Sequence, residues 1–166
     1  MNYFDDLTRD LHPRAESPTL FFDRTWSYGD VESNGIYYHP QLTHYAHQAF
    51  EQFFHEQTGL TYSDLSRQSS ESDAARAMHD PPIPRMTFPV EWLHQWMLLP
   101  MKAGDGYRIG IDTVDVAANR VGVRAWVVNS QLRLAAIVIW LRAAVLLDPK
   151  RKSIDIPTWF PRRVVS

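Results

Sequence analysis

The chain has 166 residues, of which 45% are hydrophobic and 22% are charged, and its formal net charge at pH 7 is -2. These values predict one globular domain with a packed core, exclude disorder of the whole chain, and argue against nucleic acid or an anionic membrane surface as the main partner. The sequence contains no cysteine, which excludes disulfides, cysteine nucleophiles and thiolate metal sites and fits a cytoplasmic protein.

The first part of the sequence predicts an arm followed by a strand. Residues 1–17 are polar and include Pro13, so we expect an N-terminal arm that precedes a single domain over residues 18–166. This arm lacks the basic and apolar regions of a signal peptide. Thr19 to Trp26 is rich in Phe and Thr, which predicts the first strand. The residues from Tyr28 to Gly35 then have turn-like composition.

Residues Pro40 to Thr58 have the pattern of a long helix. Pro40 suits the first helical position, and Gly59 suits the position just after the end. Apolar side chains recur at i, i+3 and i+4 and make one broad face, which predicts a mostly buried helix. The members of this face are Leu42, Tyr45, Ala46, Ala49, Phe50, Phe53 and Phe54.

The second half of the chain has the character of antiparallel β-structure. Residues 63–84 are rich in Ser, Asp and Pro, which predicts a connection with a short helix near 73–78. The stretch from Lys102 to Gly106 predicts a hairpin-type turn. Strands joined by short turns must pair antiparallel. Three such strands are predicted, followed by an edge segment: Tyr107–Val116, Val121–Val128, Leu132–Leu147 and Asp155–Phe160.

These elements predict the fold class. A sheet with an apolar face must cover that face, and the Pro40–Thr58 helix is the one long helix that the sequence offers. We therefore expect an α+β domain in which an antiparallel sheet wraps around a central helix. The longest apolar stretch, Leu132 to Leu147, is interrupted by Arg133 and Arg142 and is too short to span a bilayer.

The segment between the predicted first strand and the predicted helix contains the candidate catalytic residues. Its order of Tyr28, Asp30, Glu32, Gly35 and His39, with Pro40 after it, resembles the signature of the 4-hydroxybenzoyl-CoA thioesterase family. That signature is Asp-x-Asp-x-x-Gly, then an apolar residue, two residues of any kind, and a His or Tyr. Bacterial short-chain acyl-CoA thioesterases linked to the Tol–Pal system carry a similar Tyr and His. The resemblance implies a hotdog fold over almost the whole chain and hydrolysis of acyl-CoA thioesters.

The resemblance also implies a role for each of these residues. Glu32 occupies the place of the catalytic Asp and is expected to be the nucleophile or general base, with Asp30 in support and Tyr28 orienting the carboxylate. The backbone N–H of His39 is expected to hold the oxyanion, and its side chain to position water or protonate the leaving thiolate. Gly35 permits the tight turn between Glu32 and His39.

The predicted ligands and partners follow from the same resemblance. Lys102, Arg120 and Arg124 are candidates for binding the phosphates of CoA. No metal or other cofactor is required, although the His44-x-x-His47 pair with His55 leaves a zinc or iron site as an alternative. We expect a homodimer or homotetramer with the acyl-CoA substrate across the subunit boundary, and no nucleic acid or membrane span.

Other interpretations of the same residues remain open. Asp30 and Glu32 are also typical of solvated turns, His39 of a helix start, Tyr28 of a core, and the three cations of exposed turns. The Glu in place of Asp leaves a catalytically weak or inactive protein that binds acyl-CoA or acyl-carrier-protein thioesters as the second hypothesis. A dehydratase that acts on hydroxyacyl-CoA is the third.

Overall fold

A five-stranded antiparallel sheet dominates the computed structural model, which describes residues 20–25, 39–131 and 133–161. The spatial order of its strands is β1-β4-β5-β6-β3. The strands are β1 (Leu20–Thr25), β3 (Val90–Met97), β4 (Gly106–Ala117), β5 (Arg120–Asn129) and β6 (Leu134–Ala143). The predicted arm over residues 1–17 lies outside the described residues.

The central meander confirms the predicted antiparallel pairing. β4 pairs with β5 from Tyr107 opposite Asn129 to Ala117 opposite Arg120, and β5 pairs in turn with β6. The turn at Lys102–Gly106 is not a hairpin, however, because β3 and β4 are not neighbours. The chain crosses the end of the sheet there, since β3 pairs with β6 on the far side.

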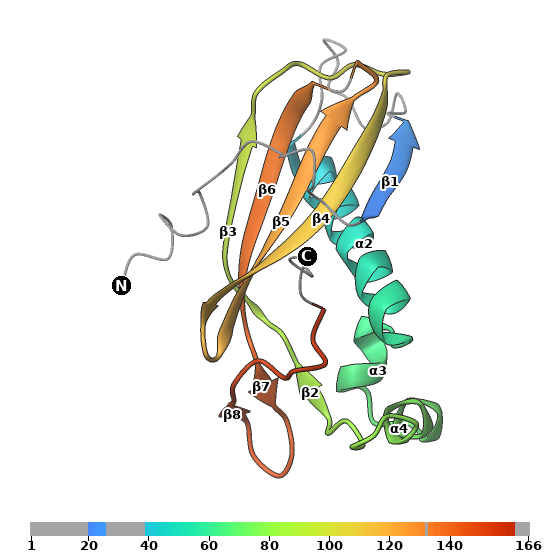
Figure 1. Ribbon diagram of the computed structural model, residues 1–166, viewed down its shortest axis with the longest axis vertical. Helices are drawn as coiled ribbons and strands as arrows, with labels where there is room; N and C mark the ends of the chain where they lie inside the picture. Colours follow the sequence, from blue (N-terminus) through green and yellow to red (C-terminus); the bar gives the residue numbers. More distant parts are fainter. Residues whose placement is uncertain (1–19, 26–38, 132, 162–166) are drawn as a thin grey trace.

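Helix α2 (His39–Thr58) covers one face of the sheet; in Figure 1 its first half lies behind the strands and its second half extends past them toward α3. Its predicted apolar face is buried: Leu42, Ala46, Phe50 and Phe54 are each 0% exposed. These side chains pack in one core with the inward residues of the sheet, among them Ile109, Ile111, Val123, Val138 and Trp140. The prediction of an antiparallel sheet wrapped around one long helix is therefore confirmed.

A smaller unit extends one end of the sheet. It consists of the helices α3 (Tyr62–Ser66) and α4 (Ser70–Ala77) and a three-stranded sheet of β2 (Met86–Thr87), β7 (Val145–Leu146) and β8 (Lys152–Ser153). The predicted connection over residues 63–84 thus contains two helices, and each is capped at its N-terminus by a hydroxyl side chain, Thr61 or Ser69. The predicted short helix near 73–78 corresponds to α4, which begins earlier, at Ser70. Helix α3 was not predicted, because its cap and turns use the polar residues typical of loops.

Two strand predictions in this region were wrong. The predicted Leu132–Leu147 strand divides into β6 and β7, because Ala144 leaves the main sheet and its N–H donates to Asn119 O at 3.2 Å. The predicted edge segment Asp155–Phe160 is not a strand. Its Phe160 N–H instead donates to Pro157 O at 3.1 Å in a turn.

The outer face of the sheet, opposite α2, is also apolar. A second cluster of buried side chains contains Trp126, Ile137 and Ile139, with Trp92 and Trp96 packed against it. Burial on both faces explains why β5 and β6 are almost continuously hydrophobic in sequence. Within this layer the guanidinium of Arg124 holds the Asp112 carboxylate through two hydrogen bonds, and their side chains are 9% and 1% exposed.

On the inner face, Arg142 is a buried cation that joins three elements. It is 2% exposed. Its Nη1 donates to Phe88 O at 2.9 Å and to the Tyr62 hydroxyl at 3.2 Å, while its Nη2 lies 3.0 Å from His47 Nδ1. Because a guanidinium only donates, Nδ1 of His47 must accept and therefore carries no proton. The Nε2–H of His47 then points to Glu51 Oε1 at 3.4 Å.

This network makes stability depend on pH. Burial lowers the pKa of His47 from its ordinary 6.5, and the neighbouring Arg142 and His44 lower the pKa further, while Glu51 opposes them. The unfolded chain therefore binds the proton more readily than the folded chain. The stability that neutral His47 contributes is complete above about pH 6.5 and is lost as the pH falls below this value.

We expect the His47→Gln variant to lose this acid sensitivity. A glutamine side chain can still accept from Arg142 but does not titrate, so its melting temperature will fall less than that of the wild type between pH 7 and pH 5. Thermal unfolding followed by circular dichroism measures both profiles. His55→Gln, which removes an exposed histidine from the same helix, is the matched control and should keep the wild-type profile. Parallel profiles for wild type and His47→Gln would contradict the assignment.

None of the helices in the described part of the chain combines the length and hydropathy needed to cross a bilayer.

Candidate functional site

The elements that flank residues 26–38, which include most of the predicted catalytic residues, meet at one end of the main sheet. β1 ends there at Thr25, which pairs with Gly106 at the start of β4. Tyr107 pairs with Asn129, so β5 ends there as well. Figure 1 shows α2 beginning at this same end. Thr25 and His39, the described residues on either side of segment 26–38, are therefore both at this end of the sheet.

The start of α2 carries the partial positive charge of the helix dipole. Its first residue is His39, and the first N–H groups of a helix have no partner within the helix. The first turn contains no acidic residue that would neutralise the helix dipole. Backbone amides placed in this way can hold a developing negative charge, such as the oxyanion of a thioester carbonyl under attack.

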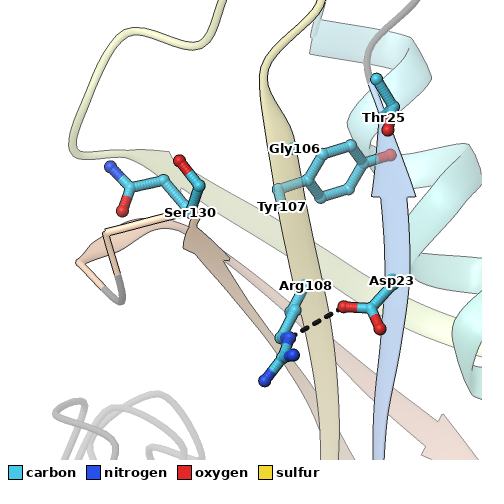
Figure 2. Close-up of a pocket in the computed structure, with 7 residues that line it drawn as sticks. Asp23, Thr25, Gly106, Tyr107, Arg108 and Ser130 are labelled. Atoms are coloured by element: carbon cyan, nitrogen blue, oxygen red, sulfur yellow. Dashed lines mark hydrogen bonds and ion pairs between the residues drawn. The ribbon is translucent and has the colours of Figure 1, made fainter.

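A hollow of about 600 Å³ opens at the same end of the sheet. In Figure 2 the ring of Tyr107 extends from β4 toward Thr25 on β1, and Arg108 reaches the Asp23 carboxylate across the two strands. That ion pair measures 2.8 Å and is exposed, so it contributes little to stability. The residues that line the hollow are Asp23, Thr25, Gly106, Tyr107, Arg108, Asn129 and Ser130.

Most of the predicted catalytic residues lie outside the described part of the chain. Tyr28, Asp30, Glu32 and Gly35 all belong to residues 26–38. Of the predicted catalytic set, the structure describes only the backbone of His39, at the first position of α2. This position agrees with the expected helix start, and the roles of all five residues stay predictions.

The three predicted CoA-binding cations lie in different places. Lys102 is exposed in a turn just before Gly106, where β4 begins. The turn is closed by the Lys102 N–H, which donates to Asp105 Oδ2 at 2.9 Å, and by Gly104, whose φ of 86° favours glycine. Lys102 therefore lies beside the end of the sheet where β1 ends and β4 begins.

Arg120 and Arg124 are placed less favourably. Arg120 pairs with Ala117 at the opposite end of the β4–β5 hairpin, and its guanidinium binds both oxygens of Glu91, at 2.7 and 3.1 Å. A strand rises about 3.3 Å per residue, so β4 separates its two ends by more than about 30 Å. Arg124 is buried against Asp112. Within one chain the three cations cannot bind the same phosphate group, and their CoA-binding role stays a prediction.

His44 and His47 of the predicted metal-site alternative have other side-chain partners. His44 Nε2 lies 3.0 Å from Gln48 Nε2, and His47 lies between Arg142 and Glu51. Over residues 20–25, 39–131 and 133–161, no group of three or more His, Asp and Glu side chains is arranged to hold a metal ion.

The structure adds two residues that the sequence did not single out. Thr43, one turn into α2, donates its hydroxyl hydrogen to Gln95 Oε1 on β3 at 2.8 Å. The two residues are 52 positions apart in the chain. No spacing pattern connects them, because their contact depends on how the helix crosses the sheet.

The three-dimensional structure is similar to those of several solved proteins. A provisionally named thioesterase from Prochlorococcus marinus is 19% identical, with a TM-score of 0.68 over 84% of this chain and 90% of that one. A 1,4-dihydroxy-2-naphthoyl-CoA thioesterase from Synechocystis is 16% identical, with a TM-score of 0.65 and the same coverage. A hypothetical protein from Staphylococcus aureus, solved in complex with CoA, is 13% identical, with a TM-score of 0.64 over 87% of this chain and 83% of that one.

The chain has the hotdog fold. The predicted fold is therefore confirmed, and several solved hotdog proteins with this arrangement are thioesterases. No protein-family model matches the sequence, and no curated protein is significantly similar to it. The resemblance to the 4-hydroxybenzoyl-CoA thioesterase family in particular stays a prediction.

Proposed function

We propose that this hotdog protein hydrolyses an acyl-CoA thioester to a free carboxylic acid and CoA. Glu32 attacks the thioester carbonyl or activates the water that does so, supported by Asp30 and oriented by Tyr28. The oxyanion is held by the N–H of His39, and the His39 side chain positions water or protonates the departing thiolate. No metal takes part in this mechanism.

The observation that carries the proposal is the placement of the two flanks of segment 26–38. The end of β1 and the start of α2 lie at one end of the sheet (Figure 1), and the first turn of α2 contains no acidic residue. A carboxylate that precedes the helix by a few residues can then face the first free amides of the helix, as acyl transfer requires. The thioesterases among the similar structures, and the one bound to CoA, support the same chemistry.

We further propose that the active unit is a homodimer formed through β3. In the strand order of the described residues, β3 is an edge strand of the main sheet, next to β6. Val90, Leu93 and Leu98, on or next to this strand, are 43%, 40% and 51% exposed, although large apolar side chains are normally buried. Antiparallel association of two copies of β3 would cover these exposed apolar side chains. The CoA then lies across the subunit boundary.

A steady-state assay with a panel of acyl-CoAs tests the proposal. Release of CoA from at least one aliphatic or aromatic acyl-CoA, followed with a thiol reagent, is the expected result. The cysteine-free chain contributes no thiol of its own to this signal. Tight acyl-CoA binding in calorimetry without turnover would instead favour the thioester-binding alternative, which the Glu at position 32 keeps open. If the protein neither binds nor hydrolyses any of the acyl-CoAs, both functions are refuted.

A further inference from the structure

A second polar contact, besides that of His47 with Arg142, joins α2 to the main sheet. Thr43 and Gln95 are both partly buried, and their hydrogen bond of 2.8 Å joins the first turns of α2 to β3. Leu42 and Ala46 on the neighbouring positions of α2 are fully buried. Met97, on the same side of β3 as Gln95, packs against the same core. Burial of apolar surface between the helix and the sheet does not require a hydrogen-bonded pair. We therefore expect Thr43 and Gln95 to have a role other than packing.

Apolar packing and a hydrogen bond constrain a helix differently. The hydrophobic contacts of Phe50, Phe53 and Phe54 hold α2 against the sheet, but burial of apolar surface has no direction. A hydrogen bond weakens steeply when its angle departs from linearity, so it fixes rotation and axial position. Thr43 suits this use because its branched Cβ restricts χ1 in a helix.

The contact lies close to the amides that the proposed reaction uses. Thr43 is four residues, or about one turn, after His39, where α2 begins. A shift or rotation of the helix at Thr43 therefore moves the first free N–H groups by a similar amount. A displacement of about 1 Å is enough to reduce catalysis by about 100-fold.

We propose that Thr43 and Gln95 are positioning residues that fix the start of α2 for the thioesterase reaction. This inference rests on the proposed function. Neither residue touches the reacting atoms. Gln95 sets the position of the helix start relative to β3, an edge strand of the main sheet and the strand of the proposed dimer interface. The oxyanion donor of one subunit is thereby held in a fixed relation to the proposed subunit boundary.

Variants at both positions test the inference with matched controls. Thr43→Val and Gln95→Met keep the size of the side chains but remove the hydrogen bond. We expect each to lower kcat by about 10- to 100-fold with little change in KM. Thr43→Ser keeps the hydroxyl and should retain most of the wild-type kcat. Because both single variants remove the same bond, the double variant should be about as slow as either single variant rather than slower by the product of their effects.

Thr58→Val is the control for a purely structural effect. Thr58 lies at the other end of the same helix, where its hydroxyl donates to Phe54 O at 2.7 Å and accepts from the Leu60 N–H at 3.1 Å. This variant should lower the melting temperature and leave kcat unchanged. A wild-type kcat in Thr43→Val and Gln95→Met, or a loss in Thr43→Ser equal to that in Thr43→Val, would overturn the positioning role alone. Absence of hydrolysis by the wild type with every acyl-CoA would overturn the proposed function and this inference with it.

Discussion

The Glu32→Gln variant is expected to lower kcat for the hydrolysed acyl-CoA by at least about 100-fold. General acid–base catalysis by a positioned side chain typically contributes 10²- to 10⁴-fold, and an amide can neither remove a proton nor attack the carbonyl. The amide keeps nearly the same size and can still form hydrogen bonds, so KM should change little. Steady-state kinetics on the best substrate of the acyl-CoA panel measures both constants.

Two further variants show whether the loss belongs to position 32. Glu56→Gln removes another carboxylate from the chain, at an exposed position of α2 where Gln52 donates to it at 3.0 Å, and should leave kcat unchanged. Asp30→Asn should have a smaller effect than Glu32→Gln, since Asp30 is assigned a supporting role. A Glu32→Gln enzyme that retains half or more of the wild-type kcat would remove Glu32 from the mechanism.

The Arg124→Met variant should be less stable than the wild type by about 3–5 kcal/mol. It removes the guanidinium that balances Asp112, whose side chain is 1% exposed on the outer face of the sheet. A charge left in a buried place without its partner costs far more than the intact pair contributes. The variant also loses the contact of Arg124 with the ring of Trp126, 5.2 Å from the guanidinium carbon to the ring centroid. Urea unfolding measures the difference.

Replacing both members of the pair separates their attraction from the cost of an orphaned charge. In the double variant Asp112→Leu/Arg124→Met no buried charge remains, so most of the stability should return. Failure of the double variant to recover would show that the layer requires the polar pair itself. The single variant also tests the predicted contact of Arg124 with CoA. If Arg124 binds a CoA phosphate, the loss of that contact will raise KM for the acyl-CoA in the fraction of the variant that stays folded.

The fold was predictable where local patterns decide it. The helical periodicity of residues 40–58 matched α2 within one residue of its start, and short turns between apolar runs identified β4, β5 and β6. The sequence could not show that the strand after Leu132 changes sheets at Ala144. It also could not show that β3 pairs with β6 rather than with β4, because these depend on contacts between distant segments.

The candidate site was predictable in part for the same reason. The order of carboxylates, Gly35 and His39 before a helix is a local pattern, and the structure places the helix start at His39. The predicted CoA cations were chosen from turns and strand ends without knowledge of the register. Register placed Arg124 opposite Asp112 on the outer face and Arg120 at the far end of the hairpin. The one sign of the Arg124–Asp112 pair in the sequence was the presence of an Arg within an otherwise apolar strand.

The pairing of β1 with β4 has a consequence for how the chain is made. Asp23 and Arg108, which meet across these strands, are 85 positions apart. A ribosome adds about 5–20 residues per second, so β1 waits roughly 4–17 s for its neighbour to be synthesised. During the same interval the apolar face of α2 has no sheet to pack against. The nascent chain therefore exposes an apolar helix face for several seconds. We expect molecular chaperones that bind such surfaces to bind the chain during translation.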